Sequence, residues 1–80
     1  MITIKALLNK IKWDKNLNPG DYNLYYLDRI SKTLKKLEYS DIIRIEGTFI
    51  IINNEKRDEV NIPMHRVRRV ENKDVVVWQR

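Results

Sequence analysis

The sequence predicts an α+β domain, in which an N-terminal amphipathic helix packs on a small, strongly curved antiparallel sheet or partial barrel of about five strands. Three observations support this fold class: a helical spacing of apolar residues at the start, a series of short β-rich segments, and an internal repeat in the second half. Eighty residues suit a single domain spanning positions 1–80, with one small hydrophobic core.

Composition and charge limit the classes of protein. Hydrophobic residues make up 42% of the chain and charged residues 34%, which is typical of a folded domain and too polar for a membrane protein. No apolar run approaches the roughly 20 residues of a spanning helix, and the start lacks the apolar segment of a signal peptide. The absence of cysteine removes disulfides and thiolate metal sites. We therefore expect a cytoplasmic protein with no membrane contact, no cofactor and no metal.

The excess of positive charge favours polyanionic partners. Sixteen Lys and Arg against eleven Asp and Glu leave a net charge of +5, and residues 60–70 contain three arginines and no carboxylate. A basic balance of this kind is typical of proteins that bind nucleic acid or an acidic surface.

The first predicted element is a helix over residues 4–12, with Thr3 as its N-cap. Its apolar residues recur at helical spacing, at Ile4, Leu7, Leu8 and Ile11, with lysines and an asparagine between them. Pro19-Gly20 is a strong turn signal that follows the helix.

The rest of the chain predicts strands and turns. Gly47 interrupts a long apolar segment and indicates a bulge or tight turn, and "ENKD" is a turn before the last strand, "VVVWQ". The expected strand segments are residues 22–29, a short element at 33–38, a long strand or hairpin at 41–54, and residues 60–64, 67–70 and 75–79.

An internal repeat supports this layout. Residues 37–51 align with residues 62–76, so that apolar positions fall on apolar positions and Gly47 falls on Asn72, which also tolerates positive φ. One unit of strand, kink, strand, turn and strand would account for both halves. The kink holds Ser40-Asp41 in the first copy and His65-Arg66 in the second, so packing alone does not dictate these residues.

The stretch "IPMHRVRR" holds the only histidine of the chain, His65, beside Arg66, Arg68 and Arg69. Val67 breaks the alternation set by Ile62 and Met64, which predicts a bulge or short turn at His65–Arg66 that presents both side chains on one surface. A guanidinium and an imidazole together suit a phosphate group. The alternative is a solvated basic face in which His65 caps a backbone carbonyl.

Four motifs resemble those of the RNA cyclic group end recognition domain family, a small and mainly archaeal family. They are Trp13-Asp14 after the helix, Asp28-Arg29 after a strand, "IPMHRV", and the closing Trp78-Gln79-Arg80. The match spans essentially the whole chain, with Met64 where the family usually has leucine and Val67 where it has isoleucine.

The resemblance implies binding of RNA ends that carry phosphate, in particular a 2′,3′-cyclic phosphate. It places Arg29, His65, Arg66 and Arg80 as phosphate contacts, and Trp13 and Trp78 as platforms for a base. Asp28 could orient Arg29 or His65, and Tyr26 and Arg68 are secondary candidates. RNA is the expected partner, together with a separate RNA-processing enzyme.

Each of these residues also has a structural interpretation. Large aromatic residues usually bury, so Trp13 is expected in the core, while burial and stacking both remain open for Trp78. Asp28 and Arg29 could form ion pairs with neighbours, and Arg80, as the last residue, could be mobile.

Three function classes follow. The leading hypothesis is an RNA-binding module without catalytic residues. The alternatives are a metal-independent phosphodiesterase or nuclease, and a basic protein–protein adaptor. A single histidine leaves Tyr25, Tyr26, Asp28 or a lysine as the second acid–base group, and the spacing selects none of them. The sequence alone does not predict an oligomeric state.

Overall fold

The computed structural model describes residues 2–80, which form one α-helix, seven β-strands and three short 3-10 turns. The α+β class is therefore confirmed, although strand residues greatly outnumber helical ones. The helix is α1 (Ile4–Trp13), and the strands are β1 (Tyr22–Leu27), β2 (Leu34–Glu38), β3 (Ile42–Glu46), β4 (Phe49–Asn53), β5 (Glu59–Pro63), β6 (Val67–Asn72) and β7 (Val75–Gln79). The 3-10 turns are η1 (Pro19–Asp21), η2 (Tyr39–Asp41) and η3 (Met64–Arg66).

Helix α1 begins and ends where its sequence dictates. The hydroxyl of Thr3 accepts a hydrogen bond of 3.1 Å from the backbone N–H of Ala6, which confirms the predicted N-cap. The apolar positions face inward and are buried, at Ile4, Leu7, Leu8 and Ile11. Asn18 then caps η1, so the Pro-Gly turn separates the helix from β1 as predicted.

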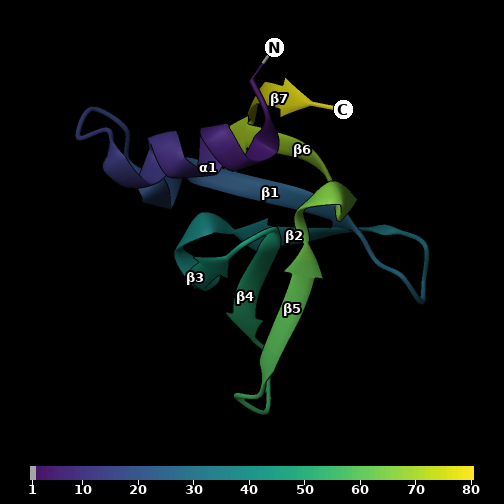
Figure 1. Cartoon of the computed structure of the whole chain (residues 1–80). Helices are drawn as coiled ribbons and strands as arrows, with labels where there is room; N and C mark the ends of the chain where they lie inside the picture. The colour runs from purple at the N-terminus through teal and green to yellow at the C-terminus, as the bar shows by residue number, and fades with distance from the viewer. Residues whose placement is uncertain (1) are drawn as a thin grey trace.

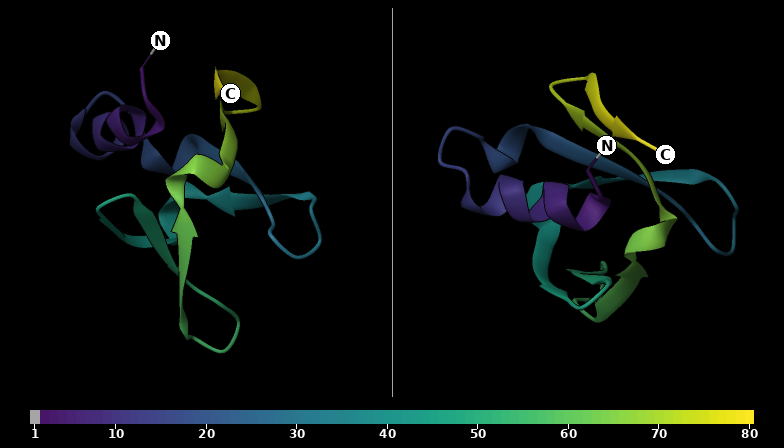
Figure 2. Two further views of the ribbon diagram at one scale, coloured as in Figure 1. Left: turned by 45° about the vertical axis from the view of Figure 1, so that its right-hand side comes forward. Right: turned by 45° about the horizontal axis from the view of Figure 1, so that its top comes forward.

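The strands form two antiparallel sheets, one in the order β2-β1-β6-β7 and the other in the order β3-β4-β5. The expectation of one curved sheet or partial barrel of about five strands is wrong, because η2 and η3 each redirect the chain from one sheet to the other. Figure 1 shows the strands of the smaller sheet running across the direction of β1, and Figure 2 shows that the two sheets do not close into a barrel.

The internal repeat corresponds to a repeated order of elements. In the first copy β2, η2, β3 and β4 follow one another, and in the second β5, η3, β6 and β7 do so. The aligned residues Tyr39 and Met64 open the two 3-10 turns and pack inward. Met64 is buried, and the Tyr39 hydroxyl donates to the Leu8 carbonyl at 3.2 Å. The next two residues of each turn project from the core, as their dissimilarity predicted.

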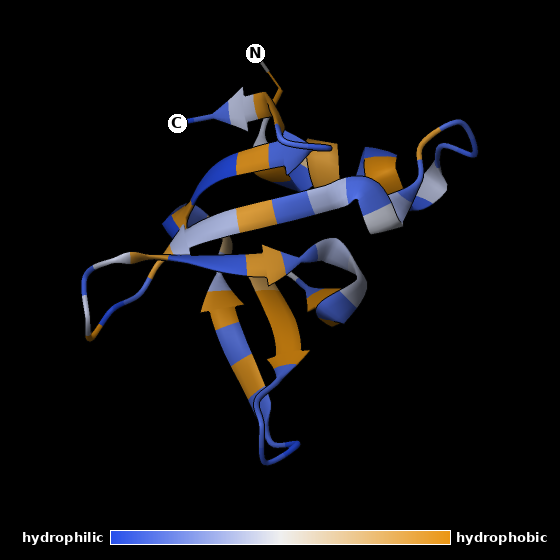
Figure 3. Cartoon of the chain, turned by 180° about the vertical axis from the view of Figure 1, so that it is seen from behind, coloured by the Kyte–Doolittle hydropathy of each residue, from blue (hydrophilic) through white to orange (hydrophobic). Residues whose placement is uncertain are grey.

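The core lies between α1 and the inner faces of both sheets. The buried side chains of α1 pack there against residues from both sheets, among them Leu24, Ile50, Val67 and Val70. In Figure 3, β4 is hydrophobic along most of its length, whereas β5 alternates between hydrophobic and hydrophilic residues, as expected for a strand with one face toward the core and one toward solvent. No helix in residues 2–80 has the length and apolar character needed to cross a bilayer.

Candidate functional site

A pocket of about 410 Å³ lies where the two sheets approach each other, and we name it the β5 pocket. Its walls are residues 26–30, at the end of β1 and in the following loop, and residues 60–63 of β5. Phe49 from the start of β4 and Arg66 from η3 complete the lining. A volume of this size is within the range of roughly 300–1,000 Å³ that is usual for small-molecule sites.

The β5 pocket brings together Arg29 and Arg66, two predicted phosphate contacts that are distant in the sequence. Arg29 comes from the β1–β2 loop and Arg66 from η3, so the approach of the two sheets determines their proximity. Neither guanidinium forms an ion pair within residues 2–80. Both therefore keep donors for an anionic ligand, and a guanidinium can contact two phosphate oxygens at once.

Asp28 organises the loop that carries Arg29. Its Oδ1 accepts hydrogen bonds from the backbone N–H groups of Ile30 at 2.7 Å and Ser31 at 3.1 Å. Its Oδ2 lies 2.8 Å from Nζ of Lys35. The hydrogen bond from Lys35, followed by those from the backbone, lowers the pKa of Asp28 to about 2.

The Asp28 carboxylate thus forms an ion pair with a neighbour, one of the two roles that the sequence left open, and its contacts within residues 2–80 are with Lys35 and the loop backbone. The carboxylate is already occupied by Lys35 and the two backbone N–H groups of the turn. These side-chain hydrogen bonds hold the loop that carries Arg29, and the backbone closes it further with hydrogen bonds from Asp28 to Thr33 and from Lys32 to Asp28, both 2.9 Å.

The predicted kink is the 3-10 turn η3, closed by a hydrogen bond from the backbone N–H of Val67 to the carbonyl of Met64. His65 is exposed and does not line the β5 pocket, whereas Arg66, the next residue, does. The carbonyl of His65 accepts hydrogen bonds from Nη1 of Arg68 and, at 3.2 Å, from Nη1 of Arg80. His65 thus contributes a backbone acceptor that holds two arginines beside η3.

The other arginines of "HRVRR" point to different neighbours. Arg69 lies 2.9 Å from Glu71 and packs over the ring of Tyr25, with 4.4 Å between the guanidinium carbon and the ring centroid. Arg80 also donates its backbone N–H to the carbonyl of Arg68 at 2.9 Å, so the last residue is attached to β6. The three arginines that follow His65 therefore differ in their surroundings: Arg66 lines the β5 pocket, Arg68 donates to the His65 carbonyl, and Arg69 contacts Glu71 and Tyr25.

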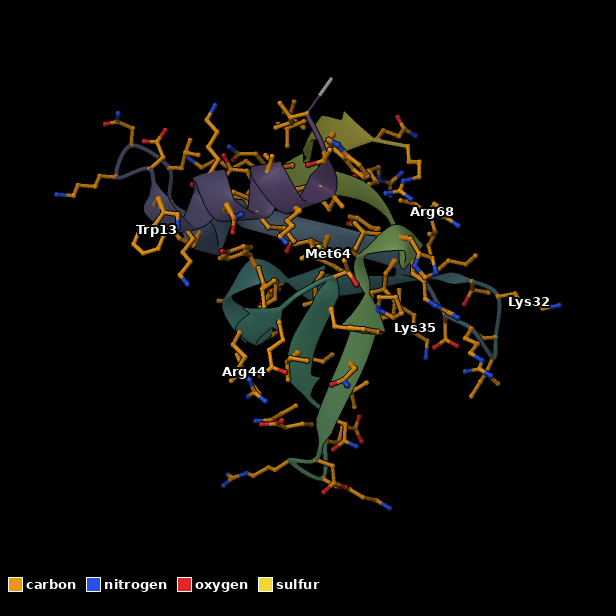
Figure 4. All side chains as sticks on the ribbon, viewed as in Figure 1. Trp13, Lys32, Lys35, Arg44, Met64 and Arg68 are labelled. Carbon is orange, nitrogen blue, oxygen red and sulfur yellow. The ribbon has the colours of Figure 1, made fainter. Side chains whose placement is uncertain are left out.

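The two tryptophans lie in opposite environments. Trp13 is 74% exposed, so the expectation that it would be buried in the core is wrong. Trp13 is the last residue of α1 and does not lie on the buried face of the helix. Lys12 Nζ lies 5.1 Å from the centroid of its ring. Figure 4 shows Trp13 at the other end of the molecule from Lys35 and Arg68.

Trp78 is 7% exposed and belongs to the core, which settles the choice left open by the sequence in favour of burial. Its Nε1 donates to the carbonyl of Ile2 at 2.9 Å, and Arg80 lies over its ring at 5.4 Å. Little of the ring remains on which a base could stack.

Tyr26 and several residues that sequence reasoning missed also line the β5 pocket. Phe49, Asn61 and Ile30 are exposed and add an aromatic ring, an amide and an aliphatic side chain beside the two guanidiniums. Nothing in their local pattern distinguished Phe49 from a buried strand residue. Successive side chains of a strand point to opposite faces, so Asn61 faces away from the side on which Ile62 is buried. This is a weak signal that Asn61 is exposed.

The comparisons with known proteins agree with the resemblance seen in the motifs. A UPF0248 protein of Methanococcus maripaludis is 36% identical over 69 residues, which cover 86% of this chain and 84% of that protein. A UPF0248 protein of Metallosphaera sedula is 33% identical over 79 residues, covering 99% of this chain and 94% of the relative. One from Saccharolobus islandicus is 26% identical over 80 residues.

No match to this chain was found among solved structures. The family model described as the MJ1316 RNA cyclic group end recognition domain matches residues 1–80. With this match over the whole sequence and relatives above 30% identity over most of their length, the chain belongs to the MJ1316 RNA cyclic group end recognition domain family.

Proposed function

We propose that this domain binds the phosphate-bearing end of an RNA strand in the β5 pocket, with Arg29 and Arg66 as the phosphate contacts. The observation that carries the proposal is that Arg29 and Arg66, which form no ion pair within residues 2–80, both line one pocket whose surface is otherwise largely apolar. The family description and the net charge of +5 support RNA as the polyanion.

The finer proposal is that the preferred end is a 2′,3′-cyclic phosphate. Such a group presents two unbridged oxygens, which a planar guanidinium can contact in parallel. Arg68 lies close to Arg66 in the chain, at the start of β6, and would extend the positive surface toward the next phosphate of the strand, with the His65 imidazole as a further hydrogen-bonding group.

Binding is a better proposal than acid–base catalysis for this pocket. Asp28 is the carboxylate among the residues that line it, and its pKa of about 2 makes it a weak base near neutral pH. His65, the sole imidazole of the chain, lies outside the lining. A separate RNA-processing enzyme would then act on the end that this domain binds.

The test is a binding competition among three otherwise identical oligonucleotides, ending in a 2′,3′-cyclic phosphate, a 3′-phosphate or a 3′-hydroxyl. We expect the phosphate-bearing ends to bind more tightly, and Arg66→Ala or Arg29→Ala to reduce that preference about ten- to hundredfold. Lys56→Ala removes one positive charge in the β4–β5 loop, outside the pocket, and serves as the matched control.

Equal competition by all three ends would contradict end recognition and leave general RNA binding. Conversion of the cyclic phosphate to a monophosphate by the purified domain would contradict the choice of binding over catalysis.

A further inference from the structure

The β5 pocket runs along an edge of β5 that pairs with no other strand in residues 2–80. Four consecutive residues, 60–63, line it, and β5 is the last strand of the sheet β3-β4-β5. Figure 1 shows β4 on one side of β5 and the β1–β2 loop on the other. One edge of β5 is therefore paired with β4, and the opposite edge faces the pocket.

The register identifies the backbone groups on this free edge. The N–H of Met64 donates to the carbonyl of Thr48 at 2.8 Å, one step beyond the paired residues Phe49 and Pro63. Hydrogen-bonded pairs alternate along an antiparallel ladder, so Ile62 bonds to β4 next. Asn61 and Pro63 then direct their backbone groups away from β4.

Asn61 is the residue that offers both a donor and an acceptor to the pocket. Pro63 has no N–H, and proline is tolerated at an edge position for that reason. The N–H and C=O of one strand residue lie side by side and point the same way. Asn61 therefore presents an adjacent donor and acceptor on the edge that faces the pocket, whose lining also includes Ile30 and Phe49.

This pattern complements the Watson–Crick edge of a nucleobase. Every RNA base places a hydrogen-bond donor next to an acceptor on that edge, and unpaired bases are commonly read there while their rings contact aromatic side chains. We propose that the pocket receives the base of the terminal nucleotide, paired to the main chain of Asn61 and packed against Phe49, while Arg29 and Arg66 hold its phosphate. The proposal rests on the function proposed above.

A consequence is low selectivity among the four bases. A backbone donor and acceptor pair can be matched by each base in some orientation, so recognition would depend on the presence of a base more than on its identity. An extended peptide is another ligand that pairs with free strand edges. Arg29 and Arg66, which form no ion pair within residues 2–80, line the same pocket and favour a nucleotide, because a peptide backbone has no phosphate for them to contact.

The experiment compares two RNA oligonucleotides with the same 3′-phosphate, one ending in a normal nucleotide and the other in an abasic nucleotide. We expect the wild-type domain to prefer the normal end about tenfold. Asn61→Pro removes the free N–H without breaking a bond to β4, and Asn61→Ala removes the side-chain amide alone. In Asn61→Pro the ratio of affinities for the normal and abasic ends should fall to nearly one. In Asn61→Ala the ratio should fall much less, and in the control Lys56→Ala it should not change.

Each outcome separates this proposal from the one on which it rests. Equal binding of normal and abasic ends, with phosphate still required, would overturn base recognition and leave phosphate recognition intact. Loss of the phosphate requirement would overturn the proposed function itself. An equal fall in both Asn61 variants would assign the contact to the side chain and contradict the backbone pairing.

Amide hydrogen exchange tests the same contact without a substitution, in case Asn61→Pro fails to fold. The Asn61 amide should exchange rapidly in the free domain and become protected when the 3′-phosphorylated oligonucleotide binds. The Ile62 amide should be protected in both states. A protected Asn61 amide in the free domain, or an Asn61 amide that stays unprotected in the complex, would overturn the proposal.

Discussion

The guanidinium of Arg44 on β3 reaches across β4 to the carboxylate of Glu59 on β5, through hydrogen bonds of 2.9 and 2.8 Å. Its Nε also lies 2.7 Å from Glu46. In the register of the sheet Arg44 is opposite Ile51, which is 1% exposed although its neighbour Ile50 faces the main core. The ion pair therefore covers Ile51 on the outer face of the smaller sheet.

We expect the apolar residue beneath this ion pair to matter more for stability than the pair itself. Ile51→Ala should lower the free energy of unfolding by about 2–5 kcal/mol, because it leaves a cavity under Arg44. Glu59→Gln should lower Tm only slightly, since both charged side chains are about half exposed. Thermal melts at low and at high salt measure both effects. A larger loss in Glu59→Gln than in Ile51→Ala would contradict this order.

Asp28 predicts an acid-sensitive contribution to stability. Its pKa in the folded domain is about 2, below the ordinary 3.8, so the contribution is fully present above pH 4 and disappears as the pH falls toward 2. Asp28→Asn removes the ion pair with Lys35 and should abolish this dependence. The measurement is the difference in Tm between wild type and variant, which should shrink between pH 4 and pH 2. A constant difference across this range would show that Asp28 does not titrate with folding.

The two tryptophans should differ in accessibility. In Trp78→Phe the remaining fluorophore is Trp13, and acrylamide should quench it strongly because it is exposed. In Trp13→Phe the remaining Trp78 should resist quenching. Similar quenching constants in the two variants would contradict their placement.

The same pair of variants should differ in stability. Trp78→Phe loses the hydrogen bond to Ile2 and part of the core, at a cost of about 1–3 kcal/mol. Trp13→Phe should stay within about 0.5 kcal/mol of wild type, as is usual for exposed positions. Denaturant unfolding compares the two, and a destabilised Trp13→Phe would reveal a packing role that its exposure does not indicate.

The β3–β4 and β6–β7 turns make opposite predictions. Gly47 has φ of 59°, and apart from its two chain neighbours no residue in 2–80 comes within 4 Å of where a Cβ would stand, so Gly47→Ala should cost about 1 kcal/mol from backbone strain alone. Lys73 and Asp74 both have positive φ, 49° and 69°, as in a type I′ turn. Asp74→Gly should therefore stabilise the domain by about 0.5–1 kcal/mol. Unfolding free energies of the two variants should lie on opposite sides of wild type.

The local elements were predictable because they depend on residues close in sequence. The helical spacing from Ile4 to Ile11, the Pro19-Gly20 turn and the parity break at Val67 all correspond to observed features. The aligned residues 37–51 and 62–76 also correspond to repeated elements. The helical spacing and the strand alternation have periods of two to four residues, over which the backbone geometry is nearly independent of the rest of the fold.

The pairing of the sheets was not predictable in the same way. Alternation shows that a segment has a buried face, but it does not identify the neighbouring strands. The sequence pattern therefore does not distinguish two sheets from one. The same limit concealed the β5 pocket, since Phe49 and Asn61 acquire their role only where β5 meets the β1–β2 loop. The expected burial of Trp13 was wrong because the last residue of a helix can point toward the core or toward solvent.

The 3-10 turns η2 and η3 carry the chain between the two sheets in opposite directions, and this makes the two repeats mutually dependent. The hairpin β3–β4 of the first copy is completed by β5 of the second, and the sheet that contains the hairpin β6–β7 also contains β2 of the first. Each copy thus lends its leading strand to the other, as two subunits do in a domain-swapped dimer. Neither half holds a complete sheet of its own, so the domain should unfold in a single cooperative step, and a half-length chain should gain structure only by pairing with a second copy.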